Sequence, residues 1–335
     1  MTLTSPLRRF LLALSLGAAL PLSASAATTE LLNVSYDVAR ELYKDINPAF
    51  IAAYKQQTGQ TVSIKQSHGG SSKQARAVAD GLEASVVTMN QANDIDMLAD
   101  RGLVAKDWAK KFPHNAAPYY STMVYLVRKG NPKKIRNWDD LARPGVQVII
   151  PNPKTAGNGR YTYLAAWGSV LKKGGNEAQA RDLVSRIFKN VPILDAGGRA
   201  ATTTFTQRQI GDVLVTFENE VSMVRKEFGD NFEVVYPSSS ILAESPVAVV
   251  DKVVDRRKQR KEATAYLNFL YSPAGQEIGA KHFLRVRSDA VMKKYAANYK
   301  PIQLFTVDEL FGGWRKAQEV HFNDGGEFDK IYQSK

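Results

Sequence analysis

The chain has 335 residues, a formal net charge of +12, 44% hydrophobic and 23% charged residues, so it is ordinary globular material with enough length for one or two cores. A basic protein can bind nucleic acid or anionic membranes, but the positive charge here is dispersed. Its densest run, residues 255–261, is typical of a solvated helix. We therefore expect no nucleic-acid partner and only a mild attraction for small anions.

The absence of cysteine excludes whole classes of site. Without cysteine the protein has no disulfides, thiol chemistry or acylated lipoprotein anchor, and its core alone must hold the fold. Only four histidines are present, and they are scattered, which disfavours a zinc site. We expect no metal and no cofactor.

The first 26 residues have the pattern of a secretory signal peptide. Arg8 and Arg9 precede an apolar stretch at 10–22, and Ala24-Ser25-Ala26 is a small-residue cleavage site. The alternative, a membrane anchor, is disfavoured because the apolar run is short for a bilayer. We expect the mature protein to begin at Ala27 and to reside in the periplasm of a Gram-negative cell, without membrane insertion. Secretion into the medium is the alternative.

Strand-like apolar runs alternate with helical patterns along the mature chain, which predicts βαβ units and parallel sheets. The predicted strands are residues 31–36, 61–66, 86–88, 121–128, 146–150, 213–217, 232–237 and 247–250. The predicted helices are 38–58, 71–82, 95–101, 160–173, 178–190 and one from Glu218, and the chain after residue 250 is mainly helical. In open sheets of this kind, loops at the carboxyl ends of strands bind ligands.

Three such loops combine glycines with the start of a helix, at residues 67–73, 151–160 and 195–205. In the first, Gly69 and Gly70 permit unusual backbone angles, and Ser71 or Ser72 is expected to cap the helix. Each loop alone can be read as an ordinary turn. Together they predict an anion site, because free N–H groups and the positive end of the helix dipole favour negative charge.

A site made only of donors would select a fully ionised oxyanion. Hydrogen bonds to charged groups contribute about 1.5–3 kcal/mol each, and each helix end contributes about 0.3–1 kcal/mol. Several of them could give micromolar binding or better. A protonated oxyanion such as hydrogen phosphate would present a donor to a donor and leave groups unpaired.

Motifs spread over the mature chain carry a resemblance to a known family. They are LLNVSYD at 31–37, QSHGGS at 66–71, LVRKGNPK at 126–133, PNPK at 151–154, YLAAWG at 163–168, GDVL at 211–214 and FGGW at 311–314. Together they resemble the periplasmic sulfate/thiosulfate-binding proteins of ABC importers. The resemblance implies a monomeric receptor, not an enzyme, that delivers sulfate or thiosulfate to a membrane permease.

The resemblance also implies the fold, a type II two-lobed α/β solute-binding protein. Each lobe would be a mixed, mostly parallel sheet flanked by helices, with the ligand in the interlobe cleft. The expected division is a signal peptide at 1–26, lobe I at 27–120 plus 246–335, and lobe II at 121–245. Strands are expected to cross between the lobes near 121–128 and 241–250, and closure of the lobes would signal to the permease.

In this family the oxyanion is dehydrated and held by backbone amides and a few neutral side chains. The resemblance implies N–H donors at Asp37, Ser71, Gly157, Asn158 and Gly198, to which the Ser71 hydroxyl can add another. Positions that would support these peptide units are Arg160, Arg199 and His68. A histidine beside serines could act as a base, but in a turn it is more often structural.

Two positions depart from the sulfate-specific pattern. Ala156 stands where that pattern has a serine hydroxyl, and Phe217 where it has a tryptophan indole. Phe217 resembles the thiosulfate-binding branch, as do residues 36–38, 155–158 and 197–199. A larger anion with one poorly accepting sulfur needs fewer donors, so thiosulfate fits these changes. Ala156 departs even from that branch, which implies a lower affinity or a water in the gap. Phe217 can alternatively be read as core packing.

Other functions are disfavoured by missing motifs or stay open. The sequence has no G-x-S-x-G elbow and no H-E-x-x-H helix, which argues against a secreted hydrolase. A receptor for another oxyanion, such as molybdate, phosphate or a sulfonate, remains the main alternative.

Overall fold

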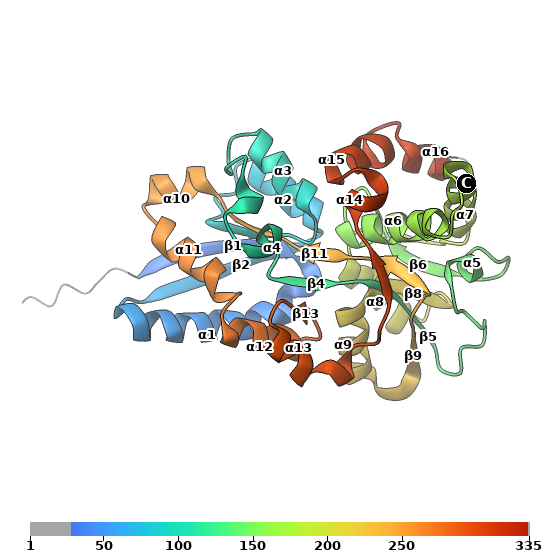
Figure 1. The fold of residues 1–335 in the computed structure, drawn as a ribbon, viewed down its shortest axis with the longest axis horizontal. Helices are drawn as coiled ribbons and strands as arrows, with labels where there is room; N and C mark the ends of the chain where they lie inside the picture. Colours follow the sequence, from blue (N-terminus) through green and yellow to red (C-terminus); the bar gives the residue numbers. More distant parts are fainter. Residues whose placement is uncertain (1–27, 334–335) are drawn as a thin grey trace, which may run out of the picture.

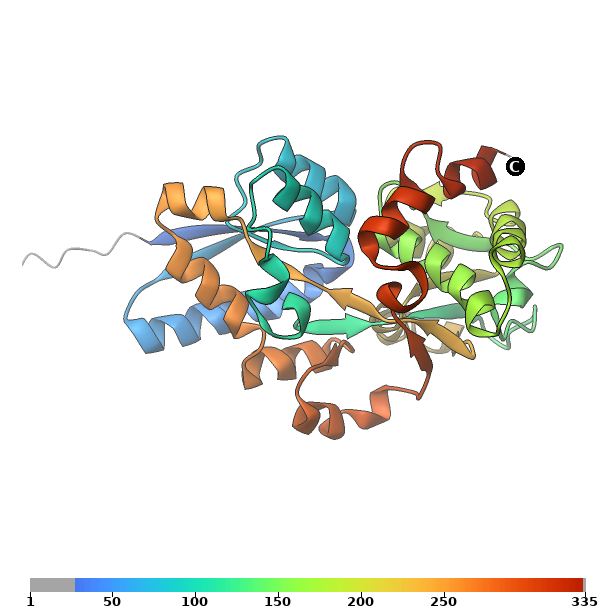
Figure 2. The same cartoon turned by 45° about the horizontal axis from the view of Figure 1, so that its top comes forward.

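The computed structural model describes residues 28–333, so the predicted signal peptide lies outside the described residues. Figures 1 and 2 show two α/β lobes side by side with crossing segments between them. The predicted two-lobed α/β fold is thereby confirmed. Within the described range no helix combines the length and apolarity needed to cross a membrane.

Lobe I is built on a four-stranded sheet of order β12-β3-β1-β2. Its strands are β1 (Thr29–Tyr36), β2 (Val62–Gly69), β3 (Val86–Thr88) and β12 (Val247–Val249). β1 pairs in parallel with β2 and β3, whereas β12 is antiparallel to β3. The parallel ends of β1, β2 and β3 therefore lie at one edge, where their loops begin.

The helices of lobe I follow the predicted pattern closely. They are η1 (Asp37–Ala39), α1 (Arg40–Thr58), α2 (Ser71–Ala79), α3 (Ala92–Asp100), η2 (Trp108–Lys110), α4 (Pro113–Ala116), α10 (Asp251–Arg257), α11 (Arg260–Phe269) and α12 (Pro273–Lys281). α1 buries Leu42, Ile46, Phe50 and Tyr54, whose spacing places them on one helical face. It ends at Gly59, whose φ of 72° is easiest for glycine.

Lobe II contains a five-stranded mixed sheet of order β7-β6-β8-β5-β9. Its strands are β5 (Met123–Arg128), β6 (Val148–Pro151), β7 (Leu194–Asp195), β8 (Val213–Phe217) and β9 (Phe232–Val235). Its helices are α5 (Trp138–Leu141), α6 (Gly157–Lys172), α7 (Glu177–Lys189), α8 (Gly198–Thr206), α9 (Glu218–Phe228) and η3 (Gly229–Asn231). β6 and β8 run in parallel, so the loops after them open at the same edge.

The crossing strands are β4 (Tyr119–Ser121) and β11 (Ala243–Ser245), which pair antiparallel between the lobes. Of the two expected crossing regions, 241–250 contains β11, whereas 121–128 overlaps β4 only at Ser121. That apolar run is β5, which pairs with β8 and β9 inside lobe II. Its continuous burial made it look like any internal strand, so its sequence could not show where the chain changes lobe.

The C-terminal part returns to lobe II, which corrects the assignment of the whole of 246–335 to lobe I. The remaining elements are β13 (Arg285–Val286), α13 (Asp289–Lys294), η4 (Ala296–Asn298), β14 (Gln303–Phe305), α14 (Val307–Phe311), α15 (Trp314–Ala317), a π-helical turn (Gln318–Phe322) and α16 (Glu327–Gln333). β14 pairs with β10 (Ser239–Ile241), and α16 packs on α7. Gly168 on α6 leaves the space that the Phe305 ring occupies.

We predict that Phe305→Ala destabilises the protein by about 3–5 kcal/mol, because the side chain is fully buried and its removal leaves a cavity. Urea unfolding measured by circular dichroism would give the free energy. The control Val320→Ala, at a residue 43% exposed, should change it by less than about 0.5 kcal/mol. A small effect of Phe305→Ala would contradict the docking of β14 on lobe II.

Candidate functional site

The three glycine loops meet across the cleft between the lobes. Gly70, at the end of the first loop, lies so close to the other two that a Cβ there would be 2.6 Å from the Thr155 carbonyl oxygen and 3.1 Å from that of Ala196. Gly70 has a φ of −56°, so its backbone angle is ordinary. The glycine is needed for close approach of two backbones, and not for the unusual angle that we expected.

Each loop leads directly into a helix whose first turn lacks a side-chain cap. α2 begins after Gly70, α6 after Ala156 and α8 after Gly197, and none of these N-cap residues makes a side-chain cap hydrogen bond. The expectation that a serine caps α2 is therefore wrong. No N-cap side chain occupies the first N–H groups of these helices, which lie at the positive end of the helix dipole. In α8, however, the Arg199 N–H donates to the Asp37 carboxylate.

The structure brings several predicted ligand residues together. Gly198 lies beside Asn158 and Asp37, since a Cβ there would be 3.4 Å from Asn158 Nδ2 and 3.8 Å from Asp37 Oδ1. Asn158 is itself fixed by its amide, which donates to Thr216 Oγ1 at 2.9 Å. Ser71 is 1% exposed at the start of α2. Asp37 and Ser71 belong to lobe I, and Asn158 and Gly198 belong to lobe II.

The Ser71 hydroxyl is already engaged within lobe I. It donates to Asp94 Oδ2 at 2.6 Å and accepts from the Asn90 N–H at 3.3 Å. A hydroxyl has one proton to donate. In this arrangement only the Ser71 backbone N–H is left for a ligand, which corrects the expectation that its hydroxyl could join.

Asp37 connects the lobes through its carboxylate. Oδ2 accepts from the Arg199 N–H at 3.1 Å, and Oδ1 accepts from the neighbouring Val38 N–H at 3.0 Å. Burial raises the pKa of Asp37, and these hydrogen bonds oppose that rise only in part. The end of β1 is thereby held against the start of α8.

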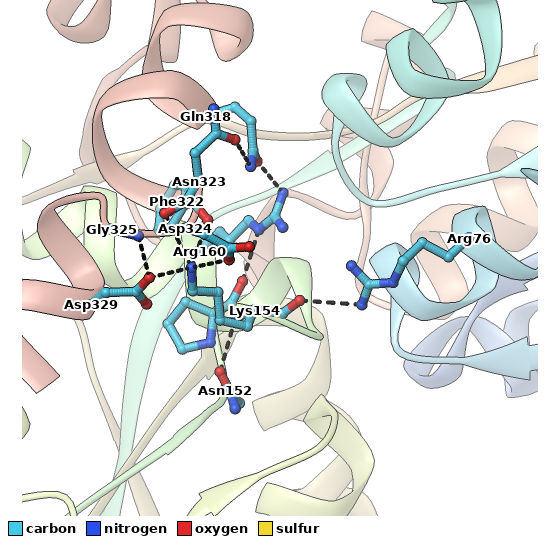
Figure 3. A network of polar contacts seen from close by, with 11 residues as sticks. Arg76, Asn152, Lys154, Arg160, Gln318, Phe322, Asn323, Asp324, Gly325 and Asp329 are labelled. Atoms are coloured by element: carbon cyan, nitrogen blue, oxygen red, sulfur yellow. Dashed lines mark hydrogen bonds and ion pairs between the residues drawn. The ribbon is translucent and has the colours of Figure 1, made fainter. Parts of the chain in front are cut away.

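The predicted supporting residues hold the loops from outside. Arg160 is 4% exposed, and its Nε donates to the Pro153 carbonyl at 2.8 Å (Figure 3). The Arg199 guanidinium pairs with Glu41 of lobe I at 2.5 Å. His68 Nδ1 lies 3.1 Å from the Tyr36 carbonyl oxygen, and burial lowers the pKa of His68. This contact gives His68 a structural role at the end of β1.

The two departures from the sulfate pattern are both buried apolar groups. Ala156 is 2% exposed at the N-cap of α6, and Phe217 is 4% exposed at the N-cap of α9. The Phe217 ring makes an edge contact with Tyr161 at a centroid distance of 5.9 Å. Both positions are therefore packed against the cleft helices and offer no polar side-chain atom.

Sequence reasoning missed two cleft residues. The first is Asn90, whose side-chain amide lies so close to Gly157 that any Cβ at position 157 would collide with it. In the described structure, Asn90 Oδ1 is buried and has no hydrogen-bond partner. Asn90 lies just after β3, so the tendency of ligand sites to form at the carboxyl ends of strands could have indicated it. Glu220 is the second, and no motif pointed to it.

Glu220 on α9 is a carboxyl 5% exposed beside other charges at the cleft. Burial raises its pKa to about 8; Arg199 lowers it, and Asp37 and Glu41 raise it further. It borders an interlobe cavity of about 690 Å³ whose lining also includes Asp45, Lys226 and His282. This raised pKa favours the protonated form of Glu220 at neutral pH.

A comparison with known families identifies the class of protein. A model of the bacterial extracellular solute-binding proteins matches residues 37–285. The chain belongs to this family. In the described part of this solute-binding protein, no cluster of three or more histidine, cysteine or acidic residues could hold a metal ion.

Named relatives extend over nearly the whole chain. A thiosulfate-binding protein from Pseudomonas aeruginosa is 57% identical over 97% of this chain and 99% of its own length. A sulfate-binding protein from Salmonella typhimurium is 55% identical over 91% of this chain and 94% of its own. The resemblance found in the motifs is confirmed.

Solved structures confirm the fold. The sulfate-binding protein SubI from Mycobacterium tuberculosis is 33% identical, with a TM-score of 0.79 over 87% of this chain and 98% of its own. A periplasmic thiamin binding protein, 17% identical, has a TM-score of 0.68 over 91% of this chain and 96% of its own. The second likeness concerns the fold alone.

We predict that Glu220→Gln removes a pH dependence of stability. The pKa of Glu220 is about 8 in the folded protein, above its ordinary 4.5, so the folded state retains a proton that the unfolded state releases. The free energy of unfolding of the wild type, minus that of Glu220→Gln, should therefore fall as the pH rises from about 4.5 to about 8 and then level off.

Urea unfolding at several pH values would measure this difference. Glu227→Gln, on the exposed side of the same helix, is the matched control and should show no such slope. A difference between wild type and Glu220→Gln that is constant across this pH range would contradict the buried, protonated carboxyl.

Proposed function

We propose that this solute-binding protein captures thiosulfate or sulfate in its interlobe cleft and delivers it to the permease of an ABC importer. The observation that carries the proposal is the meeting of three uncapped helix starts, α2, α6 and α8, at one place between the lobes. The names of the two bacterial relatives support the choice of ligand.

The proposed ligand donors are backbone N–H groups from both lobes. They belong to Asp37, Ser71, Gly157, Asn158 and Gly198. Hydrogen bonds to a charged acceptor are worth about 1.5–3 kcal/mol each, so a few of them outweigh the cost of dehydrating the anion and ordering the lobes. Because the donors come from two lobes, the ligand binds best when the lobes are together, which is what closure requires.

Arg160 and Arg199 support this site without touching the ligand. Arg160 polarises the peptide units of the second loop through Pro153, while Arg199 ties α8 to Glu41 across the cleft. A dianion is then held by oriented peptide dipoles, which cost no reorganisation on binding.

The apolar groups at Ala156 and Phe217 favour thiosulfate within this ligand class. An oxygen-only anion benefits from every donor, whereas the terminal sulfur of thiosulfate is a weak acceptor that an apolar wall tolerates. The protein acts as a monomeric periplasmic receptor and not as an enzyme.

The decisive experiment is isothermal titration of the mature protein with thiosulfate, sulfate and phosphate, after unfolding and refolding to remove bound anion. We expect micromolar or tighter binding of thiosulfate, weaker binding of sulfate and no binding of phosphate. Gly157→Ala should abolish binding, because its methyl group collides with Asn90. No binding of thiosulfate or sulfate at millimolar concentration would overturn the proposal, and molybdate and sulfonates would be titrated next.

We further predict that Ala156→Ser strengthens sulfate binding by about three- to tenfold and thiosulfate binding by less, because it adds one hydroxyl donor at the start of α6. Ala156→Gly, which adds no donor, is the matched control. If serine and glycine variants have equal sulfate affinities in the same titration, position 156 does not face the ligand.

A further inference from the structure

The C-terminal segment 314–329 is bound to the second ligand loop by a dense set of polar contacts (Figure 3). Lys154 Nζ donates to the carbonyl oxygens of Phe322 and Asn323 at 2.9 and 3.2 Å and pairs with Asp329 Oδ2 at 2.9 Å. Lys154 precedes Gly157 by three residues in the loop that opens α6. The segment and the ligand loop therefore form one unit of lobe II.

Gln318 is the residue of this segment whose side chain bonds to both lobes at once. Its Oε1 accepts from Arg160 Nη1 at 2.7 Å and from Asn93 Nδ2 at 3.0 Å, while its Nε2 donates to Asn323 Oδ1 at 2.9 Å. Arg160 lies on α6 of lobe II, and Asn93 lies on α3 of lobe I. One amide oxygen therefore accepts from both lobes.

The local backbone fixes the Gln318 side chain in this position. Gln318 opens the π-helical turn, in which its carbonyl accepts from the Asn323 N–H at 2.9 Å, five residues later. π-Helical turns cost stability relative to an α-helix and are frequent at functional sites. The second bond to Asn323, through Nε2, then orients the amide with its oxygen toward Arg160 and Asn93.

Other contacts across this side of the cleft are more exposed. Arg315 pairs with Asp100 of α3 at 2.9 Å, with side chains 63% and 57% exposed, and Arg76 donates to the Lys154 carbonyl at 3.3 Å. Exposed ion pairs contribute little because water and salt screen them. By contrast, Arg160 is 4% exposed, so its bond to Gln318 Oε1 gives a buried cation an acceptor.

We propose that Gln318 is a positioning residue that couples closure of the lobes to the ligand loop through Arg160 and Asn93. The inference rests on the proposed function, because it needs a ligand that binds between closed lobes. When the lobes separate, Asn93 leaves Gln318 and one acceptor contact is lost. When they close, the same amide joins α3 to the guanidinium that holds the Pro153 carbonyl.

The Gln318–Asn93 bond is expected to stabilise the closed, ligand-bound protein and not the open one. A contact that exists only in the closed arrangement stabilises the bound state and leaves the open, ligand-free state unchanged. The only side-chain bond recorded for Asn93 in the described structure is the one to Gln318, and its own Oδ1 is buried without a partner. Asn93→Ala therefore removes the cross-lobe bond with little other loss.

The test compares Asn93→Ala, Gln318→Ala, the double variant and Gln318→Glu by thiosulfate titration, stopped-flow dissociation and thermal unfolding without ligand. We expect Asn93→Ala to raise the Kd about three- to tenfold through faster dissociation, with an unchanged ligand-free Tm. Gln318→Ala should weaken binding at least as much. The double variant should bind thiosulfate no more weakly than Gln318→Ala alone, because both substitutions remove the same Asn93–Gln318 hydrogen bond. Gln318→Glu keeps the acceptor oxygens and should restore slow dissociation.

Arg315→Ala, at the exposed ion pair with Asp100, is the matched control and should change the dissociation rate by less than twofold. Equal dissociation rates for wild type, Asn93→Ala and Gln318→Ala would overturn the inference while leaving the proposed function intact. So would additive effects of Asn93→Ala and Gln318→Ala. If the wild-type protein binds neither thiosulfate nor sulfate, the proposed function falls and the inference falls with it.

Discussion

Close approach of bare backbone across the cleft is the constraint on which the rest of the structure depends. At Gly70 and at Gly157 a single methyl group would collide with the opposite lobe. Because the loops can touch there, the starts of α2, α6 and α8 lie close together between the lobes. The sheets of both lobes make this contact possible, because the loops that follow their parallel strands lie at the sheet edge that faces the cleft.

The charges around this contact explain how a dianion can be held without a direct cation. Arg199 is matched by Glu41, Asp37 accepts from the Arg199 N–H, and Glu220 stays protonated beside them. The charged side chains of Arg199, Glu41 and Asp37 thus bond to protein groups, which leaves peptide groups for the proposed ligand position. Such a site would gain its strength from low dielectric and fixed geometry, and for the same reason we expect it to disfavour a protonated ligand.

The sequence predicted the three loops because strand, glycine and helix start are local features that follow each other in the chain. It also predicted most strands and helices, since their periodicity is local. It could not place β14 on lobe II or assign the crossing to β4, because an apolar run of a few residues does not reveal its partner strand. The engagement of Ser71 with Asp94, 23 residues apart, was hidden for the same reason.

The close approach also explains why the C-terminal segment belongs to the site although it is the most distant part in sequence. The loop that opens α6 is held locally by hydrogen bonds to Asn152, and its other contacts come from outside the loop. Lys154 and Arg160 connect the loop to the C-terminal segment, because Lys154 pairs with Asp329 and Arg160 donates to Gln318. Phe305 anchors that segment by packing into the space left by Gly168. The uncapped helix start that favours an anion is thus possible because a distant segment supplies the missing support.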